Sequence, residues 1–365
     1  MKLLVVVLLC CIGAHATNYY VSYSGGNDSN DGKSANSAWK TFSAAGNHIN
    51  SGSFNPGDAI YLKRGDVWNE QLIPASSGAS GNPIQFDAYG TGAAPLLTAA
   101  APILPWTSGT GTPWTAVAAN TWKATIPSGI SSATLNMVKF GNVYGRKQPW
   151  GTGCPNSIVS KYDWCLSWPY LYVYSPAGVN PIVTYAADGS ILPIVAQAAG
   201  LEMISVANKS WLVFQHIQIQ NFDYMGVAVT GSSDNLVFAN MESDGMVPYK
   251  TTPNGFYVNA SSSHVQFVND DAHLNYDGFK VSAAASVTLV NCRGYANRDA
   301  GLHDTTGSNP SPVTYSYSHF YGNNVAQLPT SDVAANAGVP GPIAGSGNVS
   351  SAVAPVVTNF AMYPL

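Results

Sequence analysis

The second half of the chain repeats one pattern of apolar and polar positions. Five short segments each carry two large residues on either side of a central position, and their first residues are 24, 29, 22 and 26 positions apart. The segments are Leu212–Phe214, Leu236–Phe238, Val265–Phe267, Val287–Leu289 and Val313–Tyr315. Alternate side chains of a β-strand point to the same face, so each segment predicts a strand with an inward pair. A pair that returns about every two dozen residues predicts the stacked rungs of a solenoid.

A polar column accompanies these strands. Two positions after each segment the chain has, in order, His216, Asn240, Asn269, Asn291 and Tyr317. Three successive asparagines at one point of the repeat are similar to the internal asparagine ladder of parallel β-helices, in which stacked side-chain amides hydrogen-bond along the axis. We therefore expect these three asparagines to stack inside consecutive rungs.

A glycine column repeats in phase with the asparagines. Gly226, Gly255, Gly278 and Gly301 are each followed by a large apolar residue, at spacings of 29, 23 and 23. We expect glycine here because a tight corner between strands needs a positive φ, and we expect the next residue to fill the core. Two columns in phase predict an all-β fold, a right-handed parallel β-helix. The alternative, a β-sandwich of short strands, has turns without a fixed period.

The chain divides into three predicted segments. Residues 1–16 have the features of a signal peptide, with Lys2, a short apolar run and a small-x-small cleavage motif. Residues 17–330 are predicted to form the β-helix, with irregular early rungs over 17–205 and regular rungs over 206–330. Residues 331–365 are predicted to be a C-terminal tail or cap.

Two early stretches are predicted to depart from the rungs. Trp39–Phe42 follows a polar, glycine-rich loop and is expected to start a capping helix, because an open solenoid end exposes both core and strand edge. Residues 100–190 are rich in Trp, Pro and Tyr, which predicts long excursions from the rungs.

Composition limits the possible partners. Only 9% of the residues are charged, and the net charge of −4 offers no basic footprint for nucleic acid. No segment after the signal is apolar enough to span a membrane. We expect a soluble monomer that is secreted, or periplasmic in a bacterium.

The cysteines fit an oxidising compartment. Cys154 and Cys165 either close a short disulfide loop or remain two free thiols, and Cys292 is expected to be a packed free thiol in a rung. Leu9 before Cys10 disfavours a lipid anchor. The spacing of the cysteines does not match a structural zinc site.

A row of outward residues is the first candidate for chemistry. The residues that follow Val227, Phe256, Phe279 and Leu302 are Ala228, Tyr257, Lys280 and His303. Alternation predicts that these four side chains lie next to one another on one outer strip. Seven aspartates surround them in a chain poor in charge, which suggests a site; they are Asp223, Asp244, Asp270, Asp271, Asp277, Asp299 and Asp304. Strict alternation would point Asp304 inward.

The stretch Asp277–Ala283 and the following segments Val287–Cys292 and Asn297–Leu302 resemble the lysine-bearing rung of the family-nine polysaccharide lyases. The resemblance implies that Lys280 is the Brønsted base of a β-elimination on a uronate-containing polysaccharide. It also implies calcium bound by aspartates, for which the candidates are Asp223, Asp244, Asp270 and Asp271. The adjacent pair Asp270–Asp271 lies in the rung of the lysine, whereas the family has such a pair in an earlier rung.

A β-elimination removes the proton next to a carboxylate and expels the glycosidic oxygen, so it needs a base and neutralisation of the carboxylate. We expect His303 and Tyr257 to act as acid partners of Lys280, and Arg293 and Arg298 to neutralise the substrate. Lys280, Arg293 and Asp277 each also have a purely structural alternative. Lys280 and Arg293 would then be solvated surface residues. For Asp277, capping of a turn is favoured over a catalytic role.

Two other functions stay open at this point. A glycoside hydrolase on the same fold would use paired carboxylates, and it would release no unsaturated sugar. A noncatalytic carbohydrate-binding or surface β-helix protein would also fit the low charge and the abundant Ser, Thr, Asn and Tyr.

Overall fold

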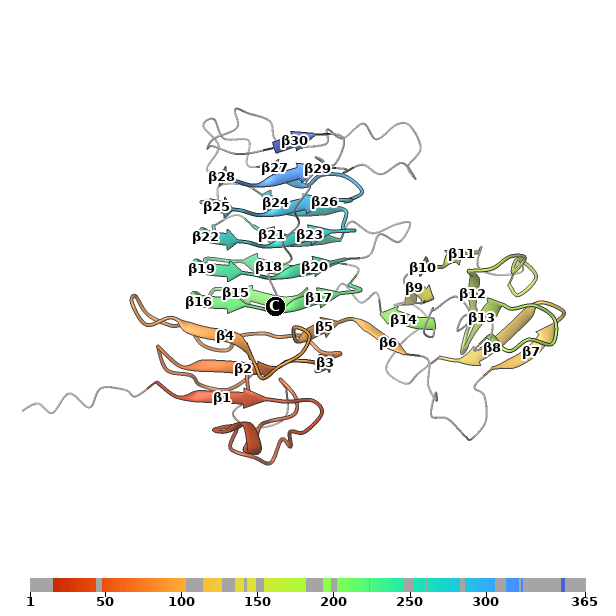
Figure 1. Ribbon diagram of the computed structural model, residues 1–365, viewed down its shortest axis with the longest axis horizontal. Helices are drawn as coiled ribbons and strands as arrows, with labels where there is room; N and C mark the ends of the chain where they lie inside the picture. The colour runs from red at the N-terminus through yellow and green to blue at the C-terminus, as the bar shows by residue number, and fades with distance from the viewer. Residues whose placement is uncertain are drawn as a thin grey trace, which may run out of the picture.

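The computed structural model shows an all-β solenoid with an insertion at one side (Figure 1). It describes residues 16–43, 48–102, 114–126, 135–140, 143–148, 154–181, 193–197, 202–222, 224–245, 253–259, 261–282, 286–305, 313–321, 323 and 349–351. The expected signal sequence and most of the expected C-terminal tail therefore lie outside the described residues. No helix in the described part has the length and apolar character needed to cross a membrane.

Three parallel sheets, which we name A, B and C, form the walls of the solenoid. In the regular rungs the chain passes from sheet C to sheet A, then to sheet B, and then to sheet C of the next rung. Sheet A contains β1 (Asn18–Val21), β2 (Ala59–Lys63), β4 (Ile84–Tyr89), β16 (Ser210–Gln215), β19 (Asp234–Ala239), β22 (Ser263–Val268), β25 (Val287–Val290) and β28 (Val313–Ser316). Sheet B contains β3 (Val67–Trp68), β5 (Leu96–Thr98), β17 (Gln218–Gln220), β20 (Glu242–Asp244), β23 (Asp271–His273), β26 (Arg293–Tyr295), β29 (His319–Tyr321) and β30 (Val349–Ser351). Sheet C contains β15 (Glu202–Ala207), β18 (Met225–Thr230), β21 (Asn254–Val258), β24 (Asp277–Ser282) and β27 (Leu302–Thr305).

The core is a stack of like side chains, as the repeat predicts. The rings of Phe86, Phe214, Phe238 and Phe267 follow one another along sheet A with centroids 4.7, 5.1 and 5.3 Å apart. Leu289 continues this inward column because it is the register partner of Phe267. The predicted strand register of the regular rungs is confirmed.

The column of Asn240, Asn269 and Asn291 stacks as predicted but not inside the solenoid. The amide of Asn269 donates to Asn240 at 3.2 Å, and that of Asn291 donates to Asn269 at 2.8 Å. All three have φ between 53° and 57° and lie at the outer corner between sheets A and B, where Asn269 and Asn291 are exposed. The expected internal position was wrong because the left-handed backbone directs these side chains outward, and the next residue of the chain fills the inner position. Asparagine tolerates this backbone conformation better than most residues.

A second asparagine ladder lies inside the corner between sheets B and C. It consists of Asn275, Asn297 and Asn323, which are 0%, 0% and 4% exposed. Asn275 Nδ2 donates to Asn297 Oδ1 at 3.2 Å, and Asn297 Nδ2 donates to Asn323 Oδ1 at 3.0 Å. The same oxygens accept the backbone N–H groups of Asn275 and Asn297, so this ladder satisfies a buried turn.

The glycine column serves a different purpose from the expected one. Gly226, Gly255, Gly278 and Gly301 do not have positive φ. Instead, a Cβ on Gly226, Gly255 or Gly278 would lie 2.5 to 2.7 Å from the carbonyl oxygen of the next glycine in the column. The column is therefore required by close stacking of backbones, whereas the positive-φ positions at the corner between sheets A and B include Asn240, Asn269 and Asn291.

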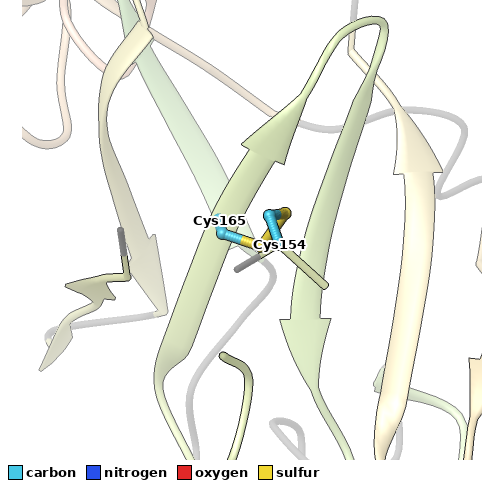
Figure 2. Close-up of a disulfide and its surroundings, with 2 residues drawn as sticks. All are labelled: Cys154 and Cys165. Atoms are coloured by element: carbon cyan, nitrogen blue, oxygen red, sulfur yellow. A yellow bond between two sulfur atoms is a disulfide. The ribbon is translucent and has the colours of Figure 1, made fainter. Parts of the chain in front are cut away.

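Residues between β5 and β15 fold as a separate unit rather than as irregular rungs, and Figure 1 shows it to one side of the solenoid. One antiparallel sheet contains β6 (Ala100–Pro102), β9 (Leu135–Phe140), β10 (Val143–Tyr144) and β14 (Pro193–Gln197). A second, mostly antiparallel sheet contains β7 (Thr115–Ala118), β8 (Thr121–Thr125), β11 (Arg146–Lys147), β12 (Asp163–Ser167) and β13 (Tyr170–Tyr174). The insertion has its own core, which includes Trp164, Leu171 and Val173. Of the two alternatives for the cysteines, the structure has the disulfide between Cys154 and Cys165 (Figure 2).

The two ends of the solenoid are covered differently. Near the N-terminus, Trp39 forms a bridge with Val21 and Phe42 is buried, so no helix starts at Trp39 as had been expected. The described helical turn in this region is η1 (Ala35–Ser37), which precedes Trp39. At the other end, β30 pairs in parallel with β29 and adds a strand to sheet B.

Candidate functional site

The site begins with the outward row of sheet C. Tyr257, Lys280 and His303 are register partners on β21, β24 and β27, as alternation predicts. All three side chains are half-buried, and Ala228, the preceding member of the row, is fully buried. Asp304 is the partner of Val281 and is only 7% exposed, so it points inward as predicted.

Asp277 holds two members of this row. It is the first residue of β24 and is 0% exposed. Its Oδ2 lies 3.1 Å from Nζ of Lys280 and 3.0 Å from Nδ1 of His303. Within the described residues its Oδ1 has no hydrogen-bond partner. Asp277 therefore does more than cap a turn, because it fixes a lysine and a histidine from neighbouring rungs at one point.

Asp299 completes the group from the turn before β27. Its backbone N–H donates to the carbonyl of Tyr276 at 2.8 Å, and the Tyr276 side chain hydrogen-bonds to its carboxylate. Burial, and then the negative charge of Asp277, raise the pKa of Asp299. The hydrogen bond to Asp277 raises the pKa of His303 against the opposing effect of burial. We refer to Asp277, Lys280, Asp299 and His303 as the Asp277 cluster.

The cluster contains donors for a metal ion. One ligand atom each from Asp277, Asp299 and His303 lies within 4.8 Å of the others. Calcium prefers six to eight oxygen ligands, and an imidazole nitrogen is not among them. The Lys280 ammonium already lies on the same oxygen of Asp277. This donor set does not fit calcium.

Of the residues expected to bind calcium, Asp270 and Asp271 point to opposite faces of the solenoid wall. Asp270 points into the solenoid, where its Oδ1 accepts the backbone N–H of Met241 at 2.8 Å and burial raises its pKa well above the usual range. Asp271 points outward from sheet B and forms a two-bond ion pair with Arg293. Asp244 ends β20, and Asp223 lies outside the described residues.

The two arginines expected to contact substrate lie in different places. Arg293 belongs to sheet B and is paired with Asp271, away from the outward row of sheet C. Arg298 precedes Asp299 in the turn between sheets B and C, and its guanidinium carbon lies 5.8 Å from the Tyr276 ring centroid. Arg298 therefore lies next to the Asp277 cluster in the chain, whereas Arg293 belongs to a separate group.

Three members of that separate group, Glu242, His273 and Tyr295, were missed in the sequence. His273 Nε2 lies 2.9 Å from Glu242 Oε1, and the His273 ring stacks on Tyr295 with centroids 4.9 Å apart. The hydrogen bond from His273 lowers the pKa of Glu242. Together with the Asp271–Arg293 pair we call this the Glu242 network. Counting four residues beyond the inward residues Phe238, Phe267 and Leu289 reaches Glu242, Asp271 and Arg293, so the repeat contained the signal.

Comparisons with known proteins agree on the fold. The model of the right-handed β-helix region matches residues 202–339, so the predicted right-handed parallel β-helix is confirmed. A glycoside hydrolase structure aligns with a TM-score of 0.51 at 10% identity, over 84% of this chain and 76% of that one. The pectate lyase Pel9A structure aligns with a TM-score of 0.49 at 18% identity, over 88% of this chain and 58% of that one.

One local match reaches higher identity. Over 76 residues, which are 20% of this chain, the sequence is 40% identical to the lacto-N-biosidase of Bifidobacterium longum subsp. longum. The match spans only 5% of that much longer protein. The family-model match and the likeness to the glycoside hydrolase structure, at 10% identity, show the fold of the solenoid alone.

Proposed function

We propose that this protein is a secreted enzyme that cleaves a uronate-containing polysaccharide by β-elimination at the Asp277 cluster. The observation that carries the proposal is the convergence of Lys280 and His303 on one oxygen of the buried Asp277. Two basic groups held by one carboxylate suit a reaction that needs both a positive charge for the uronate carboxylate and a proton acceptor.

The contacts of Lys280 and His303 with Asp277 suggest which residue neutralises the substrate carboxylate and which accepts the proton. The Lys280 ammonium lies 3.1 Å from Asp277 Oδ2 on the outer strip, and a positive charge at this place suits it to neutralising the substrate carboxylate. His303 uses Nδ1 for Asp277, which leaves Nε2 for proton transfer. We assign the base to His303 and the cation to Lys280. The resemblance to the family-nine lyases assigns the base to Lys280 instead, and an experiment can separate the two assignments.

A second candidate is glycoside hydrolysis. Burial and the nearby charge of Asp277 raise the pKa of Asp299, and a carboxyl group with a raised pKa suits the general acid of a glycosidase. The local match to a lacto-N-biosidase favours the same reading. Against it, Asp277 is fully buried and has no exposed oxygen with which to attack a sugar.

The test is a product assay on a panel of pectate, alginate and other uronans, each with calcium and with a chelator. We expect wild type to form unsaturated product, seen by its ultraviolet absorbance. Lys280→Ala should lower the rate by about 10²- to 10⁴-fold. Arg293→Ala is the matched control, since it removes a cation from the neighbouring sheet, and it should keep the wild-type rate.

Lys280→Arg separates the roles of lysine. A guanidinium keeps the charge but cannot take up a proton, so clear residual activity supports the cation and complete loss supports the base. New reducing ends without ultraviolet absorbance would replace the lyase by the hydrolase, with Asp299→Asn as the variant expected to lose activity. Equal rates for wild type and Lys280→Ala would remove Lys280 from the mechanism.

Export is part of the proposal. Residues 1–16 have the pattern of a cleaved signal, and a disulfide between Cys154 and Cys165 is stable in an oxidising compartment. The N-terminal sequence of the protein recovered from culture medium tests it, and a mature chain that starts near Thr17 is expected.

A further inference from the structure

The insertion presents a face that the proposed reaction does not use. Strand β13 alternates tyrosine with apolar residues, and Leu171 and Val173 are fully buried in the core of the insertion. Tyr170 and Tyr172 therefore point to the opposite face of the sheet, where both are half-exposed. Strand alternation keeps two aromatic rings together on one outer surface.

A lysine extends this surface. Lys123 on β8 is the register partner of Tyr172, and its Nζ lies 4.1 Å from the ring centroid of Tyr170. We call Lys123, Tyr170 and Tyr172 the aromatic face. Cys165 is the register partner of Tyr172, so the disulfide anchors the strand beside it (Figure 2).

The insertion is basic, although the whole chain is acidic. Residues 100–197 contain five of the 15 lysines and arginines but only two of the 19 aspartates and glutamates. Of those two aspartates, Asp163 is buried and ion-paired with Arg146. Exposed aromatic rings on a basic unit are complementary to a polymer that has both apolar sugar faces and negative charge.

We propose that the aromatic face binds an acidic polysaccharide at a distance from the site of cleavage. The inference rests on the proposed function for the class of polymer. The C–H face of a pyranose ring stacks on Tyr170 or Tyr172, and the Lys123 ammonium pairs with a uronate carboxylate. In Figure 1, β8, β12 and β13 lie at the end of the insertion away from the solenoid, so a long chain reaches both regions.

The experiment is affinity electrophoresis in native gels that contain polygalacturonate, or dextran as the neutral control. The test variant is the full chain with Lys123→Ala and Tyr170→Ala. The matched control is Lys40→Ala with Tyr23→Ala, because Lys40 Nζ lies 5.2 Å from the Tyr23 ring centroid and forms the same kind of pair outside the insertion. Tyr170→Phe keeps the ring and serves as a conservative variant.

We expect polygalacturonate, but not dextran, to retard the wild type. The test variant should bind about tenfold more weakly, while the control double variant and Tyr170→Phe bind as wild type does. All variants should melt at the wild-type temperature, and their rates on a short uronate oligosaccharide should be unchanged. Binding that is lost only in the test variant supports the inference even if no unsaturated product ever forms, so the proposed function can fail separately.

Three results would overturn the inference. The first is equal retardation of the wild type and the test variant. The second is retardation by dextran as strong as by polygalacturonate, which would remove the charge argument. The third is a wild-type dimer in gel filtration that the test variant converts to monomer, which would make a second copy of the chain the occupant of this face.

Discussion

The Asp277 cluster and the Glu242 network are built in the same way but hold their charges differently. Both use outward residues from neighbouring strands, on sheet C for the cluster and on sheet B for the network. In the network, Glu242 is paired with His273 and Asp271 with Arg293, so each charge has one opposite partner. In the cluster, Lys280 and His303 share a single carboxylate. The convergence of two basic groups on one buried acid distinguishes the candidate site from a network in which each charge has its own partner.

Removing the support beneath the cluster has the largest expected effect. Phe267 stacks on Phe238 and meets Phe256 and Phe279 edge to face, and these two residues precede Tyr257 and Lys280. Phe267→Ala should lower the free energy of unfolding by about 3 to 5 kcal/mol. Urea denaturation measures this. A loss below about 1 kcal/mol would mean that the ring is not in a packed stack.

The two acids at the centres of the groups should differ in their contribution to stability. Asp277→Ala leaves two basic groups without their buried partner and should cost about 3 kcal/mol, whereas Asp271→Ala breaks a partly exposed pair and should cost about 1 kcal/mol or less. Urea denaturation of both variants under one set of conditions measures the difference. Equal decreases in the free energy of unfolding would show that the buried Asp277 contributes no more to stability than the partly exposed Asp271 does.

The two histidines give the smallest effects, which depend on pH. Because the pKa of His303 is raised in the folded protein, its charged form contributes stability that is present below about pH 6.5 and disappears as pH rises through the raised value. The melting temperatures of wild type and His303→Gln should therefore differ most near pH 5.5 and converge near pH 9, with a contribution of about 1 kcal/mol or less. A difference that grows towards high pH would contradict the assigned direction.

His273 provides the matched comparison. Its pKa is raised despite opposing burial, through the hydrogen bond to Glu242, so the stability of His273→Gln should follow the same trend with pH. Only His303→Gln should also lose catalytic activity. In the wild type, activity should rise as His303 loses its proton, because a base must be neutral to act. Loss of activity in both variants would contradict the claim that the Asp277 cluster, and not the Glu242 network, takes part in catalysis.

Much of the solenoid could be predicted because the period of a strand is local. Once Phe238, Phe267 and Leu289 were aligned, their register partners and the outward row of Tyr257, Lys280 and His303 followed from alternation alone. The insertion could not be predicted in the same way. Its strands pair mostly antiparallel and have no repeat, so only the excess of Trp, Pro and Tyr and the two cysteines indicated a folded excursion.

The two predicted columns have other functions than expected, for a physical reason. Asparagine and glycine both tolerate positive φ, and the sequence does not state which column occupies the left-handed corner. The structure places Asn240, Asn269 and Asn291 there, while the glycines allow backbones to stack closely. The buried ladder that begins at Asn275 and Asn297 was hidden because its residues follow short strands of sheet B, whose apolar pattern is weak.

The sequence by itself determined the repeat, the inward stacks and the row on which Lys280 lies, because each depends on spacing along a strand. Only the tertiary structure decided which charges meet. Asp277 contacts both Lys280 and His303 because the turn between sheets B and C buries its carboxylate between rungs. Arg293 lies apart from them because its strand belongs to sheet B. Contacts across a corner depend on the path of the turn in space, and spacing along the chain does not contain that path.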